Sequence, residues 1–113
     1  MTDEEFIAVA LTLPAAERVI NHGRPGIAVK GKLFAGPGDG RGGVAVLKFT
    51  PEQQEFYCEM EPAVFRRDPS GWGKLGWTSF ILEAADAPTA RSGLAAAWRN
   101  VASKTLLKAH PDL

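Results

Sequence analysis

The chain has 113 residues, which is enough for one domain with a single core and too few for a second domain. Its 13 basic and 13 acidic side chains give a formal net charge of zero, which argues against bulk attraction to nucleic acid or to an anionic membrane. The hydrophobic content of 45% is typical of a globular protein and excludes a disordered or fibrous one.

The cysteine content and the first residues predict a cytoplasmic protein. Cys58 is the sole cysteine, so no internal disulfide ties the fold to an oxidising compartment. The acidic run Asp3–Glu5 stands where a secretory signal would carry positive charge, and no apolar run approaches the roughly 18 residues of a membrane span. We therefore expect no targeting segment and no contact with a membrane.

The first predicted element is a helix over about residues 3–12. Thr2 followed three residues later by Glu5 is the pattern of a capping box, in which each side chain accepts a hydrogen bond from the other residue's amide. Pro14 is placed to stop the helix, because the residue before a proline avoids helical geometry. One helical face carries apolar residues at the i, i+3, i+4, i+7 spacing: Phe6, Val9, Ala10 and Leu13.

Short antiparallel strands are expected next, because apolar runs alternate with turn-forming glycines and prolines up to residue 35. These strands contain Ile20, Ile27–Val29 and Leu33–Ala35. The segment Gly36–Gly43 holds five glycines and one proline, and it predicts a flexible hairpin loop before a strand over residues 44–49. Part of it matches G-x-G-x-x-G, but the match leads into a strand instead of a helix, so we assign no phosphate site there.

A second helix is predicted to begin after Thr50. Thr50, Pro51 and Gln53 combine an N-cap, a first-turn proline and a capping-box partner. Pro62 ends this helix. Its apolar face is expected to consist of Phe56, Tyr57 and Met60.

Two strands and a long helix complete the predicted elements. The strands cover residues 63–67 and 77–84, and the helix runs from an Asp86 cap to about Lys108 with Leu94 and Trp98 on its apolar side. The whole order predicts an α+β domain in which helices cover one face of a mainly antiparallel sheet.

No residue pattern nominates a reaction. His22 and Cys58 would act as base and nucleophile only beside a third, orienting group, and nothing in the sequence places them together. Two histidines and one cysteine at distant positions also lack the spacing of a zinc site. The acidic residues 3–5 are explained by the helix dipole, which they oppose favourably. We expect no catalysis, no metal and no cofactor.

The segment Gly71–Thr78 is the most distinctive stretch, because two of the three tryptophans flank a lysine among glycines. Trp77 begins a strand and is expected to cover the sheet, whereas Trp72 is the better candidate for binding. Between residues 18 and 49 six basic residues stand against one acidic residue, while the second helix carries Glu52, Glu55, Glu59 and Glu61 nearby. Zero net charge therefore combines a basic sheet with an acidic helical surface.

Three motifs resemble those of the MmcQ/YjbR family of small bacterial proteins. They are residues 11–14 (Leu-Thr-Leu-Pro) followed by a short strand at residues 17–22, the hairpin at residues 29–35, and the Gly-Trp-Gly-Lys run at residues 71–74 followed by Trp77 and Thr78. Their order and spacing extend the resemblance from about Phe6 to Leu107. The resemblance implies an α+β fold of the double-wing type, similar to bacterial frataxin, in one domain over residues 1–113. It also implies a DNA-binding protein.

Two functions follow as hypotheses. The first is a nucleic-acid-binding domain, with DNA as a possible partner, in which Trp72 stacks on a base and basic side chains contact phosphates: Lys30, Lys32, Lys48, Arg66, Arg67 and Lys74. The alternative is a domain that binds a small ligand or a protein partner in a groove beside the Gly-Trp segment. That alternative predicts a pocket beside Trp72 with convergent polar groups.

Overall fold

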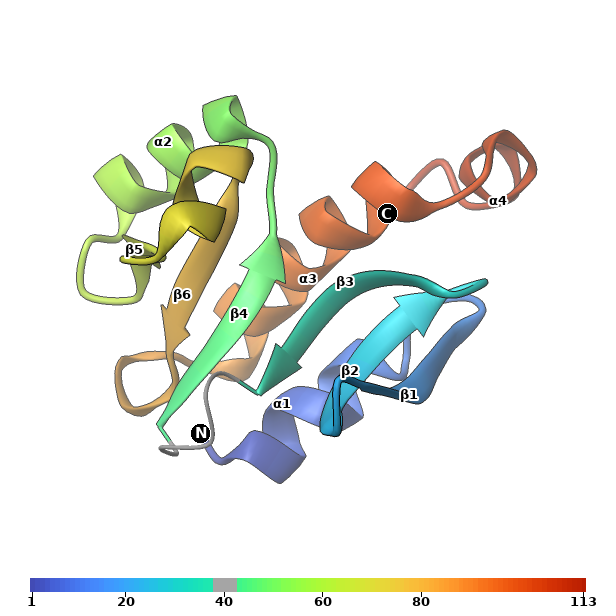
Figure 1. Ribbon diagram of the computed structural model, residues 1–113. Coiled ribbons are helices and arrows are strands. Elements are labelled where there is room, and N and C mark those ends of the chain that lie inside the picture. The colour runs from blue at the N-terminus through green and yellow to red at the C-terminus, as the bar shows by residue number, and fades with distance from the viewer. Residues whose placement is uncertain (38–42) are drawn as a thin grey trace.

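The computed structural model describes residues 1–37 and 43–113 (Figure 1). In that part of the chain, six strands form one antiparallel sheet in the order β1-β2-β3-β4-β6-β5. The strands are β1 (Ala16–Asn21), β2 (Arg24–Val29), β3 (Lys32–Pro37), β4 (Val44–Lys48), β5 (Phe65–Arg67) and β6 (Trp77–Ile81). The α-helices are α1 (Asp3–Ala10), α2 (Pro51–Met60), α3 (Ala87–Val101) and α4 (Lys104–Ala109), and the 3-10 helices are η1 (Gly71–Leu75) and η2 (Leu82–Ala84).

The helices α1 and α3 lie against one face of the sheet, as the order of elements predicted (Figure 1). Alternation along β4 explains why, since Ala45 and Leu47 are buried under the helices while Val44 and Val46 point to the other face. The core between the layers is aromatic-rich, and its largest buried side chains are Trp98, Phe6, Phe34, Phe49, Phe65 and Phe80. The opposite face of the sheet has no helical layer among the described residues, and it is the face turned toward the viewer in Figure 1.

Both predicted capping boxes are confirmed. Thr2 and Glu5 bond each other's amides at 3.1 and 2.8 Å, and Thr50 and Gln53 do so at 3.1 and 2.9 Å. The first helix ends at Ala10, two residues earlier than expected. The reason is a tightening of its last turn, in which the amides of Thr12 and Leu13 bond the carbonyls three residues back.

The predicted apolar face of α2 is wrong in two of its three members. Phe56 and Met60 are 57% and 61% exposed, and only Tyr57 packs inward, with its ring stacked on Phe49 at a centroid distance of 4.7 Å. The buried residue of α2 is Gln54. A polar side chain is tolerated there because its amide donates to backbone carbonyls of the neighbouring segment, as described below.

The predicted long helix to Lys108 is also wrong, because the chain breaks it at Ala102. Ala102 has an extended backbone with ψ of 144°, and the Ser103 side chain then accepts a hydrogen bond from the Leu106 amide at 3.2 Å to start α4. A serine at this position offers the chain an N-cap and so favours a new start. The end of the chain is held by Arg99, whose guanidinium donates to the Leu113 carbonyl at 2.7 Å.

Two other predicted element boundaries differ from those in the structure. The strand expected over residues 77–84 ends at Ile81, and η2 takes residues 82–84. β3 continues through Pro37, beyond the expected loop start at Gly36, while most of that predicted loop, residues 38–42, lies outside the described residues. The strand predicted at residues 17–22 is confirmed as β1.

Candidate ligand groove on the open sheet face

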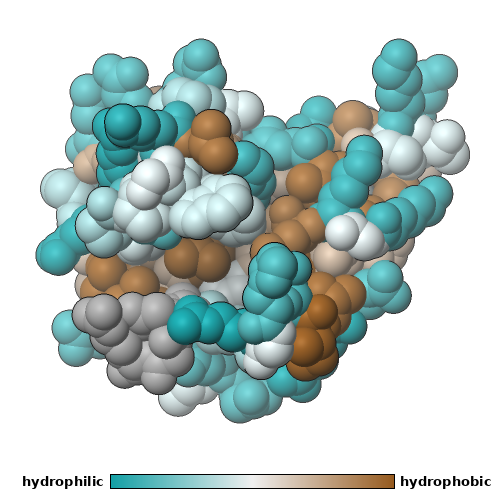
Figure 2. Space-filling view, in the orientation of Figure 1, coloured by the Kyte–Doolittle hydropathy of each residue, from teal (hydrophilic) through white to brown (hydrophobic). Residues whose placement is uncertain are grey.

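A groove of about 890 Å³ crosses the open face of the sheet. Its floor comes from strand residues whose side chains alternate toward this face: Leu33, Val44, Val46, Ser79 and Ile81. Gly36, Val46, Ser79 and Arg66 follow one another across four strands in register. Gly36 has no side chain and Ser79 has a small one, so this row leaves space for the groove above the sheet. Figure 2 shows this face, with apolar surface in its middle bordered by polar side chains.

One wall of the groove is built by β5 and the Gly-Trp segment. Arg66, Arg67, Asp68 and Trp72 line it. The carboxylate of Asp68 accepts a hydrogen bond from the Ser70 amide at 2.8 Å, which forms the turn into η1. The sequence predicted a strand that begins at Trp77 and made Trp72 the better candidate for binding. The structure shows a 3-10 helix over Gly71–Leu75 that forms the groove wall.

Gln54 anchors that wall from below. Its side-chain amide donates to the Gly73 carbonyl at 3.1 Å, to the Trp77 carbonyl at 2.9 Å and to the Thr78 hydroxyl at 3.2 Å. Gly76 has a φ of +105°, and a Cβ there would overlap the carbonyl oxygen of Phe49. A Cβ on Gly73 would likewise overlap the carbonyl of Asp68. Gly73 and Gly76 are therefore required by close backbone approach.

The two tryptophans differ as expected. Trp77 is half-buried at the start of β6, with the Lys48 ammonium 5.6 Å from the centroid of its ring. The same ammonium donates to the Leu75 carbonyl at 3.1 Å, so Lys48 ties the end of β4 to the Gly-Trp segment. Trp72 is 61% exposed at the edge of the groove. Trp72 therefore presents free indole surface, whereas Trp77 is partly covered.

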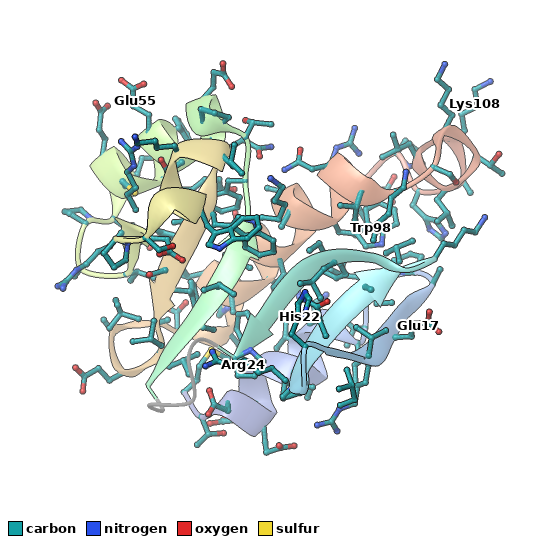
Figure 3. All side chains as sticks on the ribbon, in the orientation of Figure 1. Glu17, His22, Arg24, Glu55, Trp98 and Lys108 are labelled. Atoms are coloured by element: carbon teal, nitrogen blue, oxygen red, sulfur yellow. The ribbon has the colours of Figure 1, made fainter. Side chains whose placement is uncertain are left out.

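The opposite wall is the turn between β1 and β2, which the sequence interpretation did not include in the site. Asn21, His22, Arg24 and Pro25 line the groove from this side. His22 adopts a left-handed backbone with φ of +52° and precedes Gly23 at +76°, so the chain reverses tightly there. Figure 3 shows the side chains of His22 and Arg24 reaching from the turn toward the middle of the sheet. Arg24 belongs to the basic stretch between residues 18 and 49 that the sequence showed, but its position opposite β5 was not visible there.

The predicted contact residues divide into three groups. Arg66, Arg67 and Trp72 meet in the groove wall. Lys74 is exposed on η1 and is not among the groove-lining residues, while Lys48 is engaged by Trp77 and Leu75. The remaining pair, Lys30 and Lys32, is exposed at the turn between β2 and β3 and does not line the groove either.

Cys58 is placed unfavourably for nucleophilic chemistry. It is half-buried on α2 and packs against the core, whereas His22 is exposed on the open sheet face. Burial raises the pKa of the Cys58 thiol, against a smaller lowering by a backbone hydrogen bond from Arg67, so the thiol stays protonated near neutral pH. Over residues 1–37 and 43–113, no group of three or more His, Cys, Asp and Glu side chains could hold a metal ion.

Comparison with known proteins agrees with the sequence motifs. The YjbR family model matches residues 11–100. The chain belongs to the YjbR family. A crystal structure of Deinococcus radiodurans protein DR2400, with the family-model domain DUF419, is similar to the chain with a TM-score of 0.69 at 17% identity, over 94% of this chain and 85% of that one. This likeness confirms the α+β fold. No curated protein matches the chain.

Among residues 1–37 and 43–113, no helix is both long enough and apolar enough to cross a bilayer.

Proposed function

We propose that this member of the YjbR family binds nucleic acid through the open face of its sheet and catalyses no reaction. The observation that supports the proposal is the joint placement of Arg24, Arg66, Arg67 and the exposed Trp72 around one groove. Guanidinium groups form paired hydrogen bonds with phosphate oxygens, and an exposed indole stacks on a base. DNA is the first candidate, because the motifs shared with the MmcQ/YjbR family imply a DNA-binding protein. The cytoplasm is the expected location.

The proposal also explains how a chain of zero net charge would bind a polyanion. Within the described groove lining, Asp68 is the one carboxylate beside three arginines, and its side chain is occupied by the Ser70 amide. The acidic residues of α2 lie outside the groove lining. Local attraction therefore replaces bulk attraction. With about three phosphates contacted by arginine, the logarithm of the association constant should fall against the logarithm of salt concentration with a slope of about −2 for a single strand.

Fluorescence anisotropy with labelled 20-residue DNA strands, single and double, tests the proposal over a series of salt concentrations. Replacing both wall arginines, Arg66→Gln with Arg67→Gln, should weaken binding at least about tenfold and flatten the salt slope. The matched control, Lys104→Gln with Lys108→Gln, removes two charges from α4, which projects from the far end of the molecule (Figure 3). Absence of salt-sensitive binding at low ionic strength, or equal loss in the control, would reject the proposal.

A second candidate function is the binding of a small anionic ligand or of a protein partner, and the groove itself favours it. A hollow of about 890 Å³ with an apolar floor and convergent polar groups falls within the usual range for small-molecule sites. Thermal unfolding in the presence of mononucleotides and aromatic carboxylates distinguishes the two. A saturable rise in Tm without any oligonucleotide binding would favour the small-ligand function.

A further inference from the structure

We infer that the groove accepts an unpaired base between its two walls, so that the protein selects single-stranded over double-stranded nucleic acid. This inference rests on the proposed function and adds the form of the nucleic acid to it. The structure places polar groups on both sides of an apolar floor.

The floor of the groove is mostly apolar, so a ligand that covers it should present an apolar surface. Val44 pairs with Ile81 and Val46 pairs with Ser79, and these four side chains all face the groove and are half-buried. An unpaired base offers a flat, weakly polar face that matches such a floor. In a duplex the base faces are stacked on one another, and only base edges, sugars and phosphates are presented to a protein.

The two walls limit the size of a ligand that can enter the groove. His22 and Arg24 rise from the turn between β1 and β2, and Arg66 and Trp72 rise from the opposite side, around a volume of about 890 Å³. That volume suits a ligand of the size of one or two nucleotides. Phosphates outside the base would reach the arginines of both walls, because the backbone of a single strand can bend around an inserted base.

Trp72 is the residue that gives the inference a specific test. Its indole is 61% exposed at the edge of the groove, while the backbone beneath it is held by the Ser70 side chain and by Gln54 through Gly73. An exposed indole on a hydrogen-bonded backbone is a stacking platform. Leu75 lies on the same 3-10 helix, is 55% exposed and does not line the groove, so it provides a matched apolar control.

The experiment compares three labelled DNA probes at one salt concentration: a 12-residue oligothymidylate, a blunt duplex of the same length, and a single strand of abasic sites with the same phosphates. We expect the oligothymidylate to bind at least about tenfold more tightly than either other probe. Trp72→Ala should weaken oligothymidylate binding at least about fivefold and leave the abasic strand unchanged, while Leu75→Ala changes neither. Circular dichroism checks that both variants are folded.

Intrinsic fluorescence gives an independent readout of stacking. Trp98 is fully buried and Trp77 is half-buried, so quenching by oligothymidylate should come mainly from Trp72 and be lost in Trp72→Ala. Equal affinity for duplex or abasic strand, with salt-sensitive binding retained, would overturn this inference and leave the proposed function standing. Failure to bind any of the three probes would overturn both.

Discussion

At the scale of single residues, the groove wall depends on positions where a side chain would be impossible. Gly76 has a left-handed backbone, and the carbonyl oxygen of Phe49 lies where a Cβ of this residue would have to be. Gly71, five residues earlier, has open space around it. The same residue type therefore has different importance at the two ends of η1, and mutation of each should show it.

Gly76→Ala should destabilise the protein by about 2–4 kcal/mol, because the new methyl group overlaps backbone and the positive φ is strained for alanine. Gly71→Ala should change the free energy of unfolding by less than about 0.5 kcal/mol. Urea denaturation followed by fluorescence measures both. Similar losses in the two variants would contradict the close approach at Gly76.

Gln54→Leu should cost about 1–3 kcal/mol, because the carbonyls of Gly73 and Trp77 would lose the donor they share. Glu55→Leu is the control, since it introduces the same side chain one position along α2 at a site exposed to solvent (Figure 3). If the first variant is as stable as the second, Gln54 does not anchor the wall. Hydrogen exchange at residues 71–77 would report the expected loosening.

At the scale of elements, the helix starts are set by short-range hydrogen bonds. Thr2, Thr50, Asp86 and Ser103 each accept a bond from the amide three residues later. Three of these caps were predicted, because a cap and its partner lie within one turn of sequence. The Ser103 cap was missed, because the apolar pattern continues across it and only the extended backbone of Ala102 reveals the break.

The Asp86 cap should make stability depend on pH in the acid range. Two hydrogen bonds from Thr89 hold the pKa of Asp86 below its ordinary value. The bond from the Thr89 side chain has the larger effect, and the bond from the Thr89 amide has the smaller one. A carboxylate whose pKa is lower in the folded state stabilises fully above its unfolded pKa, about 3.9, and loses that contribution as pH falls through the folded value. Wild type should therefore lose more stability than Asp86→Asn between about pH 4 and pH 2. Parallel loss in both proteins, measured by urea denaturation, would exclude this role.

At the scale of the whole molecule, stability and proposed binding are assigned to opposite faces of one sheet. The helical face carries the buried aromatic core, with the Trp98 indole bonded to the Pro14 carbonyl at 2.8 Å. The open face carries the groove, the arginines and Trp72. Variation of the groove should therefore be nearly neutral for folding.

We expect Arg66→Gln and Trp72→Ala to change the free energy of unfolding by less than about 0.5 kcal/mol each, while Phe80→Ala costs about 3–5 kcal/mol by leaving a cavity in the core. Chemical denaturation of the three variants checks this separation. Large destabilisation by either groove variant would show that the groove residues also hold the fold. Near-neutral values would make their effects on binding directly interpretable.

Local chemistry was sufficient for much of the architecture. Caps at Thr2, Thr50 and Asp86, the alternation in β4 and β6, and the motif order of the YjbR family act over a few residues or survive as spacing, so they are legible in the chain. The exposure of Phe56 and Met60, the burial of Gln54 and the two-walled groove were not legible. Each depends on which segments meet across the sheet, and the β1–β2 turn and β5 are separated by more than forty residues before folding brings both to the same groove.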